Sequence, residues 1–385
     1  MDPGEIDFQK SAPSLLTAAL IVKDEEPVLD ACLASLTPIA DEIVIVDTGS
    51  TDRSREIAKA HGALVIDRAW TGDFAAARNI GLAAARGRWI LCIDADERLA
   101  PVERSKVEAL LDAPDLLAGR LWLRPKAGFT LYREYRLFRN DPRIRFQGII
   151  HEKVSSDIQR LAKEKGLRIA EMDIRLEHVG YDGPQDRKHR RNLPLLRAEL
   201  MLRPDNAYNW HHLGRVLDGL GDRAAAFDAW RRSLEVVRRC GVERSSDWVV
   251  YVELVRADEI DLAEARALHL EAMALFPDNP LLQFCGATLD SRSGDQASAI
   301  EVFQELASID AQTYSHPLTA FDKRLFGEFA WAALGTCCFK LGRYGESAAW
   351  FAKAAAADPQ SLEYRVKHQL AAGKTASLVR PCLFG

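Results

Sequence analysis

Two aspartates separated by one residue are the strongest candidates for chemistry in this chain. An apolar run at residues 89–93 leads directly into Asp94 and Asp96. Side chains two apart on an extended segment point the same way, so both carboxylates can face one divalent cation. Proteins usually hold Mg²⁺ or Mn²⁺ with one or two carboxylates plus substrate phosphates. The pair therefore indicates a cation site for a phosphorylated ligand, although aspartates in this position also cap helices.

Two other polar clusters could also take part in catalysis or binding. His151 and Glu152 follow an apolar strand pattern and can supply a general base or a metal ligand, or form a pair on a solvent-facing edge. Four basic or imidazole side chains at residues 188–191 lie near an expected helix start. They can grip a diphosphate. Taken alone, their pattern favours a solvated helix face.

The elements that position the aspartates alternate in type. Apolar runs at 15–22, 42–47, 63–66 and 89–93 predict buried strands, and 28–36, 54–60 and 74–85 predict the helices between them. This order is typical of a parallel α/β sheet, in which ligands bind beyond the carboxyl ends of the strands. Residues 116–154 then alternate apolar with charged side chains, as half-exposed strands do, and 168–177 predicts one more strand. Neither glycine-rich phosphate motif, G-x-G-x-x-G after the first strand or G-x-x-x-x-G-K-[ST], is present, so metal and basic side chains must handle phosphate.

The second half of the chain repeats itself. Residues 210–214 and 331–335 both read W-x-x-L-G, and each is followed by small and aromatic residues at the positions of a tetratricopeptide unit, whose period is about 34 residues. Two weaker copies lie between them, and residues 311–326 look like an insertion. Such arrays form a curved solenoid that commonly binds a peptide or protein on its concave face. Packing on the α/β domain or on itself explains the pattern equally well.

Length and composition limit the class of protein and the number of domains. With 385 residues, 48% hydrophobic and 28% charged, the chain resembles an ordinary globular protein of two domains. A net charge of −5 argues against nucleic-acid binding, and no apolar run is long enough to span a bilayer. The seven cysteines lack zinc spacing, and the first residues lack signal-peptide character, so we expect a cytoplasmic protein, with attachment to the inner face of a membrane left open. The expected division is a tail at 1–13, an α/β domain at 14–200 and a helical-repeat domain at 201–385.

The first half, taken as a whole, resembles an inverting family 2 glycosyltransferase with the GT-A fold, a Rossmann-like mixed sheet. The matching stretches are residues 20–26, 45–52, 73–79 and 93–97, in this order and at this spacing. Residues 147–152 and 178–181 are similar to the branch related to lipopolysaccharide-core and bacteriocin glycosyltransferases. The second half resembles a short tetratricopeptide array.

The resemblance implies roles for individual residues. The implied nucleotide contacts are Val22, Glu25, Asp47, Ser50, Asp52, Arg78, Asp94, Lys188 and Arg191, with Asp47 accepting from the uracil N–H. Asp94 and Asp96 would hold Mn²⁺ or Mg²⁺, and His178 would be an extra ligand or a phosphate contact. Glu152 would take the proton of the acceptor, with His151 as the second choice.

Three of these residues also have structural explanations. Asp52 can be a helix cap, and Arg78 can pair with a surface carboxylate. The negative charge of Glu25 can interact favourably with the positive end of the dipole of the helix that it precedes.

The leading hypothesis is a metal-dependent transferase that moves a sugar from a UDP-sugar to a glycan, a peptide or a small molecule. The repeat domain would recruit the acceptor or form a homodimer. One rival is an interaction scaffold with a degenerate transferase half. Another is a sugar-nucleotide pyrophosphorylase, which would need a basic glycine-rich loop where residues 23–26 are largely acidic.

Overall fold

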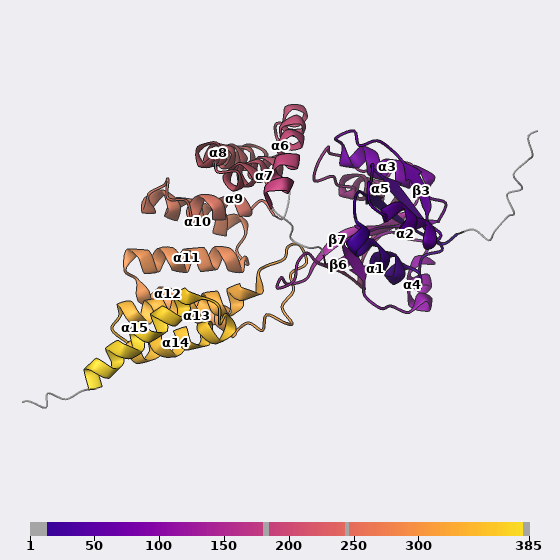
Figure 1. Ribbon diagram of the computed structural model, residues 1–385. Helices are drawn as coiled ribbons and strands as arrows, with labels where there is room; N and C mark the ends of the chain where they lie inside the picture. Colours follow the sequence, from indigo (N-terminus) through magenta and orange to yellow (C-terminus); the bar gives the residue numbers. More distant parts are fainter. Residues whose placement is uncertain (1–13, 180–184, 243–245, 380–385) are drawn as a thin grey trace, which may run out of the picture. The chain divides into compact units, whose positions relative to one another are not determined.

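The computed structural model describes residues 14–179, 185–242 and 246–379 (Figure 1). The expected tail at 1–13, residues Gly180 and Tyr181 of the later motif, and Cys382 lie outside the described residues. The chain divides into two compact units. The first comprises Met1–Ala127 and Arg133–Pro204, and the second comprises Gly128–Tyr132 and Asp205–Gly385.

The first unit is built on one mixed sheet of strand order β3-β2-β1-β4-β7-β6-β8-β5. Its strands are β1 (Leu16–Val22), β2 (Glu42–Asp47), β3 (Leu64–Asp67), β4 (Trp89–Cys92), β5 (Glu97–Leu99), β6 (Leu116–Arg124), β7 (Tyr132–Arg139) and β8 (Arg168–His178). Its helices are α1 (Glu26–Leu36), α2 (Ser54–Ala60), α3 (Phe74–Ala84), α4 (Arg104–Leu111), α5 (Ser155–Lys165) and α6 (Gln185–Leu202). The expected α/β architecture with a mixed sheet is confirmed.

The four parallel strands position the aspartates. Strands β1, β2 and β4 are buried along almost their whole length because they carry apolar side chains on both faces. The register pairs Val22 with Asp47 across β1 and β2, and Ala19 with Cys92 across β1 and β4. The carboxyl ends of these strands therefore meet at one edge of the sheet. Beyond β4 the sheet changes direction, because β7 pairs antiparallel with β4.

The second unit is helical, as the repeat pattern predicts. Its helices are α7 (Ala207–Gly219), α8 (Arg223–Cys240), α9 (Val249–Val255), α10 (Leu262–Leu275), α11 (Pro280–Ser293), α12 (Gln296–Ser308), η1 (Lys323–Phe326), α13 (Glu328–Lys340), α14 (Tyr344–Ala357) and α15 (Leu362–Val379). Successive helices pack in pairs, α7 on α8, α11 on α12 and α13 on α14. A Cβ on Gly214 would lie 2.3 Å from Nε1 of Trp230, so the glycine of the W-x-x-L-G pattern allows this close approach.

The segment expected to be an insertion between repeats, residues 311–326, has a defined partner within the second unit. The short segment Gly128–Tyr132 runs along it, with isolated β-bridges from Phe129 to Asp322 and from Leu131 to Ser315. Thr130 is buried and bonds Phe321 twice: its backbone N–H donates to the Phe321 carbonyl at 2.9 Å, and its hydroxyl oxygen accepts from the Phe321 N–H at 2.9 Å.

None of the helices within residues 14–179, 185–242 and 246–379 combines the length and the apolar composition that a membrane-crossing segment requires.

Candidate active site

Asp94 and Asp96 lie in the short turn between β4 and β5, at the edge where the parallel strands end. Their side chains are 36% and 32% exposed, so both are accessible from solvent. The Asp94 carboxylate accepts a hydrogen bond from Nη2 of Arg78 at 2.6 Å, and its other oxygen lies 3.6 Å from Nη1 of Arg136. Burial would raise the pKa of Asp94, but the positive charges of Arg78 and Arg136 outweigh it and lower that pKa.

Arg78 joins the aspartate to the candidate base. Its Nε donates to Oε1 of Glu152 at 2.6 Å while Nη2 donates to Asp94, so one guanidinium holds both carboxylates. The side chains of Arg78 and Glu152 are each 11% exposed, and the guanidinium lies over the ring of Phe146 at 5.3 Å from its centroid. Arg78 therefore pairs with two carboxylates, one of them partly exposed (Asp94) and the other largely buried (Glu152).

The loop that carries Glu152 is fixed at several points. Gln147 and Lys153 exchange two backbone hydrogen bonds of 3.0 Å, which close the loop. The backbone N–H of Ile149 donates to the buried carboxylate of Glu199 in α6, and its carbonyl accepts from Phe74 at the start of α3. Because α3 also carries Arg78, the loop and the arginine are positioned by the same helix. His151 has a left-handed backbone with φ of +54° and is half-buried beside Glu152.

His178, proposed from the sequence as an extra metal ligand or a phosphate contact, lies beside Asp96. It ends β8, where it pairs with Glu97 of β5, and its Nδ1 lies 3.4 Å from Oδ1 of Asp96. The hydrogen bond to Asp96 raises the pKa of His178. Among the described residues, no three acidic, histidine or cysteine side chains are grouped closely enough to hold a metal without help.

The donor set nevertheless fits a cation that is completed by substrate. Mg²⁺ and Mn²⁺ accept one or two carboxylates and fill their other positions with water and phosphate oxygens, and imidazole also suits Mn²⁺. Asp94, Asp96 and His178 supply two carboxylates and one imidazole at one edge of the sheet.

Asp47 is the best-prepared ligand group on the nucleotide side. It is buried at the end of β2, and its Oδ1 accepts from the backbone N–H groups of Gly49 (3.0 Å) and Ser50 (2.9 Å). Its Oδ2 is buried and accepts no hydrogen bond from the described part of the chain. A buried carboxylate oxygen without a donor is costly, so this atom is suited to a donor supplied by a ligand.

The remaining residues of the first two motifs hold the loops together. The Asp52 carboxylate accepts from the N–H and the hydroxyl of Ser54 and, through its second oxygen, from the N–H of Glu26 at 2.9 Å. The carbonyl of Val22 accepts from Thr48, and the hydroxyl of Ser50 accepts from the N–H of Asp24. Asp52 thus supports the starts of α1 and α2, as its alternative explanation requires.

Glu25 and two basic residues of α6 influence one another. Burial, together with the negative charges of Asp96 and Asp94, raises the pKa of Glu25 to about 7, whereas the charge of Lys188 lowers it. The guanidinium of Arg191 lies over the ring of Phe74, 5.6 Å from its centroid, and burial lowers its pKa. Lys188 itself is exposed. The start of α6 is therefore only in part the solvated face that its sequence alone favours.

Two residues without a separate role in the sequence analysis complete the site. Glu97 is buried; its Oε2 accepts from the backbone N–H of Asp94 at 2.9 Å, and its Oε1 accepts from Nη2 of Arg136 at 2.8 Å. Burial raises the pKa of Glu97 to about 7. The sequence did give one indication of Glu97, because it lies within residues 93–97, a stretch that matches the glycosyltransferase family. Arg136 sits in a strand whose alternation suggested exposure, so nothing in the sequence marked it.

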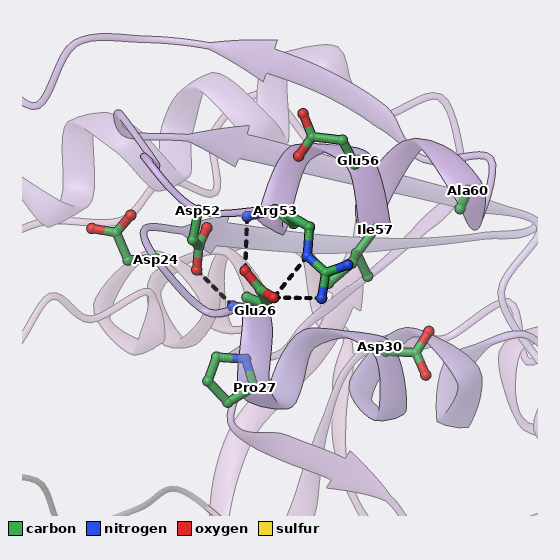
Figure 2. Close-up of a pocket in the computed structure, with 9 residues that line it drawn as sticks. All are labelled: Asp24, Glu26, Pro27, Asp30, Asp52, Arg53, Glu56, Ile57 and Ala60. Atoms are coloured by element: carbon green, nitrogen blue, oxygen red, sulfur yellow. Dashed lines mark hydrogen bonds and ion pairs between the residues drawn. The ribbon is translucent and has the colours of Figure 1, made fainter.

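A groove of about 870 Å³ opens beside the starts of α1 and α2 (Figure 2). Its lining residues are Asp24, Glu26, Pro27, Asp30, Asp52, Arg53, Glu56, Ile57 and Ala60. Arg53 is the single cationic side chain among these nine, and Glu26 binds it through both oxygens, at 3.0 Å from the backbone N and 2.8 Å from Nε. The surplus of carboxylates in this groove would repel a diphosphate.

Comparisons with known proteins match two parts of the chain to known families. Residues 17–163 match the model of the family described as glycosyl transferase family 2, and residues 328–361 match the tetratricopeptide repeat. A TPR repeat-containing protein of Synechococcus elongatus is 38% identical over 228 residues, which are 57% of this chain and 56% of that protein. The SPbeta prophage-derived glycosyltransferase SunS of Bacillus subtilis is 25% identical over 246 residues, 62% of this chain and 57% of SunS. The chain thus spans little more than half the length of these curated relatives.

Among solved structures, glucosyl-3-phosphoglycerate synthase from Mycobacterium tuberculosis, in complex with Mn²⁺, uridine diphosphate and glucosyl-3-phosphoglycerate, is 19% identical with a TM-score of 0.35. That match covers 49% of this chain and 80% of the synthase, and its TM-score is too low to support a conclusion about fold or function. The two family matches, by contrast, confirm both resemblances seen in the sequence. Residues 17–163 form a glycosyltransferase family 2 domain, and the chain joins this domain to helical repeats of the tetratricopeptide type.

Proposed function

We propose that the chain is an inverting, metal-dependent glycosyltransferase that uses a nucleotide-sugar, with a UDP-sugar as the favoured donor. One observation carries the proposal: the carboxylates of Asp94, Asp96 and Glu152 gather at the edge where the parallel strands end, within a family 2 domain. This is where open α/β sheets bind ligands.

Asp94 and Asp96 would hold Mn²⁺ or Mg²⁺, with His178 as a third ligand. When bound, the cation would offset the negative charge that develops on the departing diphosphate. The position of His178 supports this assignment, because its Nδ1 lies 3.4 Å from Oδ1 of Asp96, at the same edge of the sheet. Lys188 and Arg191 of α6 are proposed to contact the diphosphate from the side of Glu25.

The nucleoside would occupy the ends of β1 and β2. The unpaired Oδ2 of Asp47 would accept from the N–H of uracil, which supports UDP over nucleotides without such a donor. Glu25 would contact the nucleoside, and Ser50, Asp52 and the backbone of Val22 would shape its pocket through the loop contacts described above.

Glu152 is the proposed general base. It would accept the proton of the acceptor hydroxyl or thiol while that oxygen or sulfur attacks the anomeric carbon from the face opposite the diphosphate. The bond between the anomeric carbon and the diphosphate oxygen breaks, the nucleoside diphosphate leaves, and the configuration inverts. His151 would take this role if the acceptor approaches from its side of the loop.

The repeat unit is proposed to recruit the acceptor, a glycan, a peptide or a protein, or to pair with a second copy of the chain. Its match to the tetratricopeptide model supports an interaction role of this kind.

The test is a donor panel with Mn²⁺ present and absent, scored by donor hydrolysis and by calorimetric binding. We expect at least one UDP-sugar to bind and to be hydrolysed slowly in a metal-dependent way. Asp96→Asn should abolish both effects. The control is Asp30→Asn, which removes an exposed carboxylate of α1 that pairs with His61, the residue just after α2; it should change neither effect. If no UDP- or GDP-sugar binds to the wild-type chain, the scaffold alternative replaces this proposal.

A further inference from the structure

One guanidinium connects the two halves of the candidate site. Arg78 donates at 2.6 Å to Asp94, a proposed cation ligand, and at 2.6 Å to Glu152, the proposed base. These carboxylates belong to different segments, the turn after β4 and the loop at residues 147–153. Arg78 is largely buried and lies over Phe146, so packing restricts its side chain.

The contact with Asp94 competes with metal binding. The Asp94 oxygen that accepts from Arg78 cannot take the same direction to a cation, and the positive guanidinium repels a divalent ion at close range. The second Asp94 oxygen faces Arg136 at 3.6 Å, a looser contact that a cation can displace more easily. The contacts with Arg78 and Arg136 thus neutralise the charge of Asp94 and disfavour a bare cation beside it.

We propose that Arg78 is a positioning residue that couples occupation of the donor site to release of the base. A nucleoside diphosphate brings negative charge to the cation site, so the guanidinium moves from Asp94 to the diphosphate and its bond to Glu152 loosens. The base then becomes free for an acceptor only after the donor and the cation are bound. The competition between Arg78 and a cation for Asp94 follows from the contacts alone. The release of Glu152 as a base rests on the proposed function.

The first experiment measures Mn²⁺ alone binding to the full chain by calorimetry, followed by Mn²⁺ binding in the presence of UDP. Coupling between sites typically amounts to 5- to 150-fold in affinity. We therefore expect Arg78→Met to bind Mn²⁺ alone roughly tenfold more tightly than the wild type. UDP should improve Mn²⁺ affinity strongly in the wild type and only weakly in Arg78→Met.

The matched control is Arg86→Met, which removes a guanidinium that pairs with Glu42 at 2.7 Å, outside the site residues named above. It should leave Mn²⁺ binding unchanged. If Arg78→Met does not fold, as judged by circular dichroism, Arg78→Lys serves instead, because a lysine has one ammonium group and cannot make both bonds in the same geometry. Equal Mn²⁺ affinities in the Arg78 variant and in Arg86→Met would overturn the competition.

A double-mutant cycle tests the link to the base. Glu152→Gln leaves Arg78 with Asp94 as its charged partner, so Mn²⁺ should bind more weakly in this variant. The same substitution in the Arg78→Met background should have a clearly smaller effect. Additive effects would refute the coupling. Loss of the proposed function looks different, because Mn²⁺ would then fail to bind the wild type even with UDP present, or would bind Asp96→Asn equally well.

Discussion

Glu97→Ala should loosen the turn that presents Asp94. The substitution removes the acceptor of the part-buried Asp94 N–H, at 2.9 Å, and the closest carboxylate of Arg136, at 2.8 Å. An unsatisfied buried N–H costs about 1–3 kcal/mol, and breaking a buried ion pair costs about 3–5 kcal/mol. Arg136 keeps Glu134 at 3.2 Å and Asp94 at 3.6 Å, which reduces the second cost. We therefore expect a loss of about 3 kcal/mol.

Hydrogen exchange of peptides that span β4 and its turn measures this locally, which suits a chain of two units. A loss of about 3 kcal/mol corresponds to exchange faster by on the order of 100-fold at the Asp94 amide. The control is Glu134→Ala, which removes a 40% exposed partner of the same guanidinium and should cost less than about 1 kcal/mol. Similar exchange in the two variants would refute the reasoning.

The same comparison has a pH dependence of known sign. Burial raises the pKa of Glu97 from 4.5 to about 7, so its carboxyl group binds protons more tightly in the folded chain. The stability that this group contributes is complete below pH 4.5 and declines as the pH rises through about 7. The difference between Glu97→Ala and the wild type should therefore be larger at pH 6 than at pH 8. A difference that grows toward pH 8 would contradict the direction of the shift.

Three further predictions follow from single residues. Asp47→Asn places an amide opposite the uracil N–H, so the affinity for UDP measured by calorimetry should fall by roughly 10- to 100-fold. The melting temperature should change little, and an unchanged affinity would exclude the contact. Glu25 has a pKa raised to about 7, so Glu25→Gln should lessen the decline in melting temperature between pH 5 and pH 8, and an identical decline would contradict this. Thr130→Val removes the hydroxyl that accepts from the buried Phe321 N–H, and should destabilise the second unit by about 1–3 kcal/mol in urea unfolding; a neutral result would argue against that bond.

The parts of the site that follow strands could be predicted from the sequence. Asp47 and Asp94 each terminate or follow a buried apolar strand, and parallel strands must end at a common edge. The start of α3 is equally local, because Asp73 directly precedes the helix and accepts from the N–H of Ala76. Local patterns therefore placed Asp47 and Asp94 at the same edge of the sheet.

The contacts between distant segments could not be predicted in the same way. Arg78 and Glu152 are 74 residues apart, and no periodicity relates them. Arg136 lies on β7, and its alternating pattern gave no sign that the strand turns back against β4 and directs this arginine to Glu97 and Asp94. The pairing of Thr130 with Phe321 spans 191 residues and depends on tertiary structure alone.

A crystal structure of the full chain with Mn²⁺ and UDP tests the central claim most directly. The account predicts a cation bound by Asp94 and Asp96 together with diphosphate oxygens, and the uracil N–H within hydrogen-bond distance of Asp47. A cation and nucleotide bound away from both aspartates, for instance in the acidic groove between α1 and α2, would contradict it.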